Sequence, residues 1–334
     1  MERLATHCKA LDALSDGGLP TGTITQVFGE KALGKSILSL QTAFSAVCEG
    51  KSAIVVDTEQ SYRNYLLPYW GPALSKRFGR DVRVVEAVME REPRQPKRKG
   101  GVTRSQLSTL ISAALSRAGV SYLESQLSEV VDILSPEVAV RMEEGEGPRV
   151  IYLQVPEITD LLALHGVDGV IAVSENGRVE LRLKRAPVYP SPLHYIAKEA
   201  DARLIVYDSI SAPLKSVFAG TADLPARSSS LAMILMNAQR LCVEFELAVL
   251  ATSHVTVNPI HAWERRPFGG TILGHEAKFS FELTHHGANR GEGAEAVNPE
   301  DEEESSRKVW VQRHPAMADY SRFGYFTIRE DGIH

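Results

Sequence analysis

The chain has 334 residues, of which 43% are hydrophobic and 24% charged, and its formal net charge at pH 7 is −5. A chain of this size can bury an ample core, as one large domain or two small ones. The net charge gives no global basic field, so any contact with nucleic acid must come from individual loops. No apolar run approaches the roughly 20 residues of a membrane span, and the first residues lack a signal-peptide core.

We therefore expect a cytoplasmic protein with no membrane partner. Its three cysteines, Cys8, Cys48 and Cys242, show no metal-binding spacing, and the last two lie on apolar faces of predicted helices. Buried thiols in a reducing compartment are the simplest interpretation.

The first strong motif is a phosphate loop of the form G-x-x-x-x-G-K-S. It follows a β-branched run over 23–28, which predicts a buried strand, and precedes a helical apolar pattern over 36–49. In such a strand–loop–helix, backbone N–H groups and the positive end of the helix dipole surround phosphate oxygens. Lys35 adds a charge for the β- and γ-phosphates, and the Ser36 hydroxyl can bind Mg²⁺.

We predict that the whole loop binds nucleotide; the alternative is an ordinary glycine-rich turn. Two of its positions, Ala32 and Leu33, often carry glycine in such loops, so the backbone is less free than usual. The predicted nucleotide-binding residues of the loop are Gly29, Glu30, Lys31, Ala32, Leu33, Gly34, Lys35 and Ser36.

The next predicted strand, 52–57, is followed by Glu59. In open α/β sheets, ligands bind at the carboxyl ends of the strands. We therefore predict that Glu59 is catalytic with Lys35 and orients and deprotonates the attacking water. The alternative is a surface acid on a loop.

The pattern weakens between 63 and 203. Residues 105–134 favour helix, 149–155 favour a strand, and 170–183 predict a hairpin around an Asn-Gly turn. The hairpin interrupts the alternation of strands and helices, so we expect an inserted region over about 80–192. Within it, the basic run 91–101 predicts a solvated connector, with a nucleic-acid contact as the alternative.

Alternation returns with a helix over 193–200 and an apolar strand that ends at Asp208, the Walker B arrangement. We predict that Asp208 holds Mg²⁺ together with Ser36. After a long helix, the strand 247–252 ends at Ser253 and His254. These two are predicted to sense the γ-phosphate; a structural histidine is the alternative.

Two alternating segments, 278–284 and 308–312, predict a pair of antiparallel strands. Between them, residues 287–306 are rich in glutamate and contain glycine. Such a composition cannot bury enough apolar surface to order itself, so we expect a disordered hairpin tip. An electrostatic mimic of DNA is the alternative.

Several of these segments resemble the RecA/RadA/Rad51 recombinases, especially the archaeal RadB-type paralogs. The resemblance covers about 60% of the chain. Its motifs are the run from Leu11 to Gly29, Asp57-Thr58-Glu59 with Tyr62-Arg63, 204–211, Phe268-Gly269-Gly270 with His275, and the tail 314–333.

The resemblance implies one RecA-like P-loop ATPase domain, a mostly parallel twisted sheet flanked by helices, carrying an inserted α+β region. It implies ATP and Mg²⁺ as cofactors and a role in DNA repair and homologous recombination. Single-stranded DNA, a recombinase or another repair protein, and further copies in a homo-oligomer are the implied partners.

The family also implies two DNA-contacting loops, here 215–227 and 254–275. Aromatic rings interleaved with arginines suit stacking on bases and contact with phosphates, whereas the alternative is a surface loop with a few buried rings. The predicted DNA-binding residues are Arg227, Trp263, Arg265, Arg266 and Phe268.

Two other functions remain open at this point. One is a nucleotide-switched adaptor that recruits a recombinase and barely hydrolyses ATP. The other is a KaiC-like signalling ATPase without a direct role on DNA.

Overall fold

The computed structural model describes residues 2–90, 139–142, 147–173, 179–183, 187–218, 220–257 and 265–334. The chain divides into two compact units. The first, here called the core, comprises Met1–Val88 and Met142–His334, and the second comprises Met89–Arg141. Strand β6 (Ala139–Met142) lies where the second unit ends.

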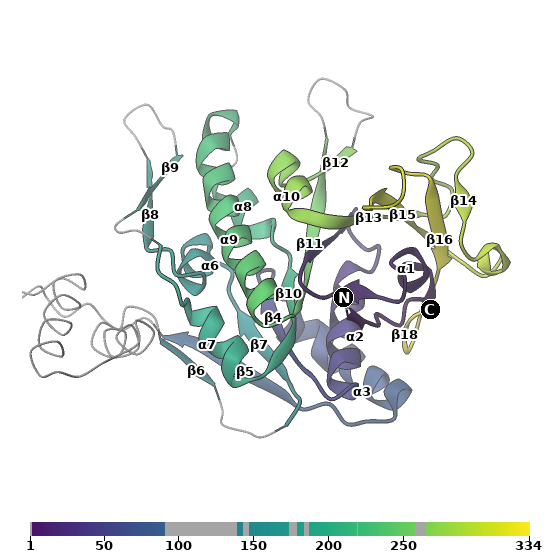
Figure 1. Ribbon diagram of the computed structural model, residues 1–334, viewed down its shortest axis with the longest axis horizontal. Helices are drawn as coiled ribbons and strands as arrows, with labels where there is room; N and C mark the ends of the chain where they lie inside the picture. Colours follow the sequence, from purple (N-terminus) through teal and green to yellow (C-terminus); the bar gives the residue numbers. More distant parts are fainter. Residues whose placement is uncertain are drawn as a thin grey trace, which may run out of the picture. The chain divides into compact units, whose positions relative to one another are not determined.

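The core is built on one large sheet whose central strands are parallel (Figure 1). In spatial order the parallel strands are β13 (Ala277–His285), β3 (Ile24–Gly29), β11 (Ala248–Val257), β10 (Ala202–Asp208), β4 (Ser52–Asp57), β7 (Val150–Gln154) and β5 (Val84–Glu90). Beyond β13 the sheet continues with antiparallel β15 (Arg307–Arg313) and β16 (Arg322–Phe326), then the short β14 (Glu295–Ala296). Strand β12 (Arg265–Pro267) pairs with the end of β11.

The register of the parallel strands gathers their carboxyl ends at one edge. Gly29 at the end of β3 lies opposite His254 of β11, and Asp208 at the end of β10 lies opposite Asp57 of β4. The phosphate loop therefore opens at the same edge as the acidic residues that follow the neighbouring strands.

Helices cover both faces of the sheet (Figure 1). Leu204 and Val206 of β10 share a hydrophobic cluster with the helix after the phosphate loop, whereas Tyr207 points to the other face and bonds to His165. The helices are α1 (Lys9–Leu14), α2 (Lys35–Cys48), η1 (Tyr62–Leu66), α3 (Leu67–Phe78), α6 (Ile158–Leu164), α7 (Pro192–Glu199), α8 (Ala212–Val217), η2 (Thr221–Asp223), α9 (Leu224–Glu244), α10 (Gly270–Glu276) and η3 (Pro299–Asp301).

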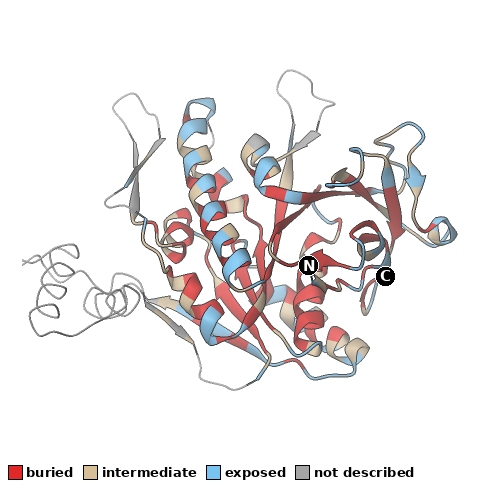
Figure 2. Ribbon diagram, viewed as in Figure 1, coloured by how far each residue is buried: buried red, intermediate tan, exposed pale blue. Residues whose placement is uncertain are grey.

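Three two-stranded sheets complete the described elements: β1 (Arg3–Leu4) with β2 (Leu19–Pro20), β8 (Gly169–Val173) with β9 (Val179–Leu183), and β17 (Ile328–Arg329) with β18 (Gly332–Ile333). The central strands are buried on both sides (Figure 2), as expected for parallel strands with helices on both faces. None of the described helices has the length and apolarity to span a membrane.

The expected insertion over 80–192 is too wide. Strands β5 and β7 pair with each other in parallel, and β7 pairs in parallel with β4, so both belong to the core sheet. The separate unit is limited to Met89–Arg141. Strands β8 and β9 form the predicted antiparallel pair, whereas its Asn-Gly turn, the helical segment 105–134 and the basic run 91–101 lie outside the described residues.

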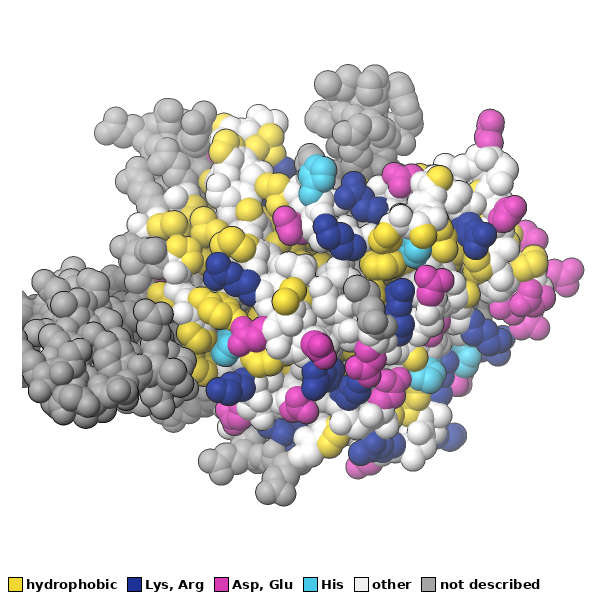
Figure 3. All heavy atoms as spheres, in the orientation of Figure 1, with side chains coloured by type: hydrophobic (Ala, Val, Ile, Leu, Met, Phe, Trp, Pro, Cys, Tyr) yellow, Lys and Arg dark blue, Asp and Glu magenta, His cyan; other side chains and the backbone are white. Residues whose placement is uncertain are grey.

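The prediction of a disordered tip over 287–306 is also wrong. Arg290 forms a two-pronged ion pair with the buried Glu282, at 2.7–3.0 Å, and β14 adds a strand to the sheet beside β16. The Asn298 side chain bonds to the backbone of Tyr325 in both directions. Acidic side chains still gather on the surface here, at the right of Figure 3. The tertiary contacts outweigh the unfavourable composition.

Candidate nucleotide-binding site

The phosphate loop connects β3 to α2 in a conformation that leaves the start of the helix open. Gly34 is the N-cap residue of α2 with φ +98°, and none of the described side chains caps this helix end. The first N–H groups of a helix have no partner within the helix and favour negative charge. An oxyanion ligand such as a phosphate group therefore suits this position.

Lys35 brings a buried cation to the loop. Its side chain donates to the backbone oxygens of Gly29 at 2.9 Å and Glu30 at 2.6 Å. Burial lowers the pKa of the Lys35 ammonium, while the nearby Asp208 and Glu59 carboxylates act in the opposite direction. The structure thus places the predicted Lys35, Asp208 and Glu59 close together.

Asp208 is buried at the end of β10, and Thr252 of the adjacent β11 donates a hydrogen bond to its Oδ1. Burial raises the pKa of the Asp208 carboxyl to about 6, and the Thr252 and Ser36 hydroxyls act against this rise. Its other oxygen, Oδ2, is buried and accepts no hydrogen bond of standard geometry from the described residues. This oxygen is thus able to accept a further ligand, such as a metal ion.

This arrangement fits a magnesium ion. No group of three His, Cys, Asp or Glu side chains among the described residues could hold a metal by itself. Mg²⁺ in nucleotide sites is held by one or two protein oxygens together with phosphates and waters. Asp208 and Ser36 supply oxygens of that kind beside the phosphate loop.

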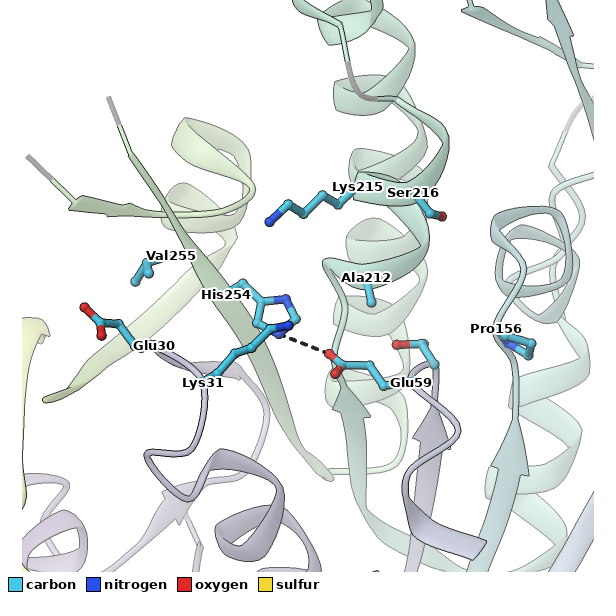
Figure 4. Close-up of a pocket in the computed structure, with 11 residues that line it drawn as sticks. Glu30, Lys31, Glu59, Pro156, Ala212, Lys215, Ser216, His254 and Val255 are labelled. Carbon is cyan, nitrogen blue, oxygen red and sulfur yellow. Dashed lines mark ion pairs between the residues drawn. The ribbon is translucent and has the colours of Figure 1, made fainter. Parts of the chain in front are cut away.

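Glu59 lies at the mouth of the same site, where two neighbouring groups engage its carboxylate. The Ser209 hydroxyl donates to Glu59 Oε1 at 2.6 Å. His254 Nε2 lies 3.3 Å from the same oxygen, and Figure 4 marks this ion pair. Burial lowers the pKa of the His254 imidazole, while Glu59 raises it. Ser211 lies on the other side of the ring, with its Oγ 3.4 Å from His254 Nδ1.

Glu59 and His254 face an open pocket of about 550 Å³. Figure 4 shows Lys31, Glu59 and His254 converging on it, with Lys215 above them. The pocket is lined by Gly29, Glu30, Lys31, Thr58, Glu59, Pro156, Ala212, Lys215, Ser216, His254 and Val255. The pocket thus reaches Gly29, Glu30 and Lys31 of the phosphate loop, whereas Lys35 turns back onto the backbone oxygens of Gly29 and Glu30.

Ser253 does not share in this site. Its hydroxyl is buried and accepts a hydrogen bond from Gln26 Nε2 at 2.9 Å, inside the sheet. Successive residues of a strand point to opposite faces, so only one of Ser253 and His254 can face the pocket. The prediction of a γ-phosphate contact is thus wrong for Ser253 in this conformation.

The predicted DNA-binding residues are only partly brought together. The Arg227 guanidinium lies 4.7 Å from the centre of the Phe268 ring, which is buried beneath it and is not free to stack on a base. Much of the predicted loop 215–227 is helical, in α8, η2 and the start of α9. Arg265 and Arg266 belong to β12, and Trp263 lies outside the described residues.

Sequence reasoning missed Ser209 and Thr252, which hold Glu59 and Asp208. Ser209 directly follows the Walker B residue Asp208, so its position in the sequence could have identified it as a neighbour of the site. Thr252 is identified only by the register of β10 and β11, which no sequence motif specifies.

Comparisons with known proteins match two parts of the core. A family model described as Rad51 matches residues 193–298, and one described as KaiC matches residues 4–90. A DNA repair and recombination protein RadB of Methanococcoides burtonii is 48% identical over 58 residues, which is 17% of this chain and 26% of that protein. The RadB protein of Halobacterium salinarum is 46% identical over 56 residues, 17% and 24% of the two chains.

These matches support the RecA/Rad51 superfamily, with the RadB proteins among the similar sequences. The chain's parallel sheet flanked by helices is the RecA-like α/β core, and both matching families are ATPases. The alignments span about a quarter of the length of the RadB relatives. The two family matches include the phosphate loop, in 4–90, and the Walker B strand, in 193–298.

Proposed function

We propose that this chain is a cytoplasmic ATP-binding ATPase that depends on Mg²⁺, a recombinase paralog acting in DNA repair and homologous recombination. The observation that supports it best is that Lys35, at the start of α2, lies close to the Asp208 and Glu59 carboxylates, and that Glu59 lines a pocket together with Gly29, Glu30 and Lys31 of the phosphate loop. In phosphoryl transfer, catalysis comes almost entirely from positioning and from stabilising charge.

Each residue then has a separate task. Lys35 leaves the carbonyl oxygens of the loop to stabilise negative charge on the transferring phosphoryl group. Asp208 and Ser36 hold the magnesium ion, which neutralises phosphate charge when bound. Glu59 orients and deprotonates the attacking water once Ser209 and His254 release its carboxylate.

Two variants test these tasks. Lys35→Ala removes the buried cation, so we expect ATP binding to be lost. Glu59→Gln keeps the size and hydrogen-bonding capacity of the side chain, so ATP should still bind while turnover stops. Nucleotide titration and phosphate release measure the two effects, and equal turnover by the Gln variant would refute the role of Glu59.

The role in DNA repair rests on the RadB relatives. We propose single-stranded DNA as a ligand, and a recombinase or a second copy of the chain as protein partners. ATPase activity titrated with single-stranded DNA is the direct test. A DNA-coupled enzyme should be stimulated, whereas an adaptor that only recruits a recombinase should not.

The KaiC match over residues 4–90 favours one further candidate, a signalling ATPase without a direct role on DNA. The salt dependence of binding to single strands separates the two. Contacts with phosphates release counterions, so the affinity of a DNA-binding protein falls steeply as salt rises. No measurable affinity for single strands at low salt would favour the signalling function.

A further inference from the structure

The C-terminal hairpin, made by β17 and β18, packs directly against the phosphate loop. A Cβ atom built on Gly34 would lie 2.7 Å from Ile328 Cδ1 and 3.5 Å from Ile333 Cδ1. These two side chains therefore occupy the space that a side chain at position 34 would need. Gly34 begins α2, immediately before Lys35 and Ser36, so the hairpin bears on the point where the loop enters the helix.

Hydrogen bonds fix the hairpin to α2. Gln41, a buried residue of α2, pairs with both backbone groups of Ile333: the Ile333 N–H donates to Oε1 at 2.8 Å, and Nε2 donates to the Ile333 oxygen at 3.2 Å. Arg77 of α3 donates to the same Ile333 oxygen at 2.9 Å. Figure 1 shows β18 beside α2.

The absence of a side chain at Gly332 lets the hairpin approach Gln41 and Arg77 closely. A Cβ atom at that position would lie 2.4 Å from Gln41 Oε1 and 2.7 Å from an Arg77 nitrogen. A segment that only covers apolar surface needs no directional bonds. The buried Gln41 amide, paired with the backbone of Ile333, instead fixes the position of the hairpin along α2. The distance between hairpin and loop is thus set by directional bonds.

We propose that the C-terminal hairpin positions the phosphate loop, so that nucleotide affinity depends on Ile328 and on the bonds between Gln41 and Ile333. This inference rests on the proposed function of the loop in binding ATP. Ile328 and Ile333 act as positioning residues: they support Gly34, and through it the first turn of α2 that carries Lys35 and Ser36.

The test is ATP affinity, measured by calorimetric titration of the full chain with ATP and Mg²⁺ well below the unfolding temperature. Ile328→Ala removes the support from Gly34, so we expect affinity to fall on the order of tenfold. Val297→Ala is the matched control, because Val297 is also a half-buried β-branched residue packed against the same core cluster. The ATP affinity of Val297→Ala should equal that of wild type, even if its thermal stability falls as much as that of Ile328→Ala.

Gly332→Ala provides a second, remote test. Its added Cβ displaces the ends of the Gln41 and Arg77 side chains that bind the hairpin, and the φ of +125° disfavours alanine. The hairpin is thus loosened without a change in the phosphate loop, so ATP binding should weaken as in Ile328→Ala. Wild-type affinity in a folded Gly332→Ala chain, or an equal loss of affinity in Val297→Ala, overturns the inference. A wild-type chain that binds no ATP, or a Lys35→Ala chain that binds as well as wild type, instead contradicts the proposed function.

Discussion

At the scale of single residues, the phosphate loop carries one backbone position that its residue does not favour. Ala32 has φ +64°, in the left-handed region, and its side chain is exposed. This conformation destabilises a residue that has a Cβ atom by roughly 1–2 kcal/mol. Glycine removes this strain, but it loses more backbone entropy on folding, which offsets part of the stabilisation. We expect Ala32→Gly to raise the free energy of unfolding by about 0.5–1 kcal/mol.

Urea unfolding measures this change. Ala232→Gly is the control, since Ala232 is exposed in the interior of α9, where glycine should cost about 1 kcal/mol. A loss of stability in both variants would show that the left-handed conformation of Ala32 carries no strain.

The residues of the site were largely predictable because a compact motif carries them. Gly29 to Ser36, Glu59 and Asp208 follow from spacing and from the position of each residue at a strand end. The predicted γ-phosphate contact of Ser253 was wrong because the sequence does not show toward which face of β11 each side chain points. Thr252 was missed because its role depends on strand register, a long-range property.

At the scale of elements, a buried histidine connects α6, α9 and β10. His165 follows α6 and lies 2.9 Å from Asn237 of α9 and 3.2 Å from the Tyr207 hydroxyl of β10. Burial lowers the pKa of His165 to about 4. Between its ordinary pKa and this value, the unfolded chain binds a proton that the folded chain does not.

The stability contributed by the neutral imidazole is therefore lost as pH falls below the unfolded pKa. Between pH 8 and pH 5 we expect His165 to reduce the free energy of unfolding by about 2 kcal/mol. Urea unfolding at the two pH values should show a smaller decrease for His165→Gln than for wild type. Equal decreases would mean that His165 takes up its proton in the folded chain.

An ion pair with a buried carboxylate joins the segment between β13 and β15 to the sheet. The Glu282 side chain is 4% exposed, and Arg290 binds it through two nitrogens. Arg290→Met leaves this carboxylate buried without its cation. We expect a loss of about 2 kcal/mol, less than for a fully buried pair because Arg290 is partly exposed.

A double variant checks the cause. Replacing Glu282 by Gln in the Arg290→Met chain removes the buried charge, so urea unfolding should show part of the stability restored. Limited proteolysis within 287–306 should increase in the single variant. Equal cleavage of both single variant and wild type would mean that other contacts, such as those of Asn298, hold the segment.

At the scale of the whole molecule, the alternation of strands and helices predicted the parallel core but not its boundaries. The sequence of residues 150–154 predicts a strand, and this strand is β7. Nothing in the sequence indicates that β7 lies between β4 and β5. Strand order is set by packing between distant segments, which a single sequence reveals only through local pattern. The insertion expected over 80–192 therefore wrongly included β5 and β7, two strands of the core sheet.

The observed boundaries lead to a prediction about the second unit. Every residue that lines the pocket belongs to the core. We therefore expect a chain in which a Gly/Ser linker of about 12 residues, which spans on the order of 20 Å, replaces 91–138 to fold and bind ATP with wild-type affinity. Thermal unfolding and ATP titration measure the two properties.

A matched deletion makes the result specific. Extending the replacement to 84–138 also removes β5, whose pairing with β7 completes that side of the core sheet. The longer deletion should lower the unfolding temperature and weaken ATP binding, because β7 loses a neighbour and exposes buried apolar surface. If the shorter deletion already abolishes ATP binding, the second unit takes part in the nucleotide site, and the core alone is not the ATPase.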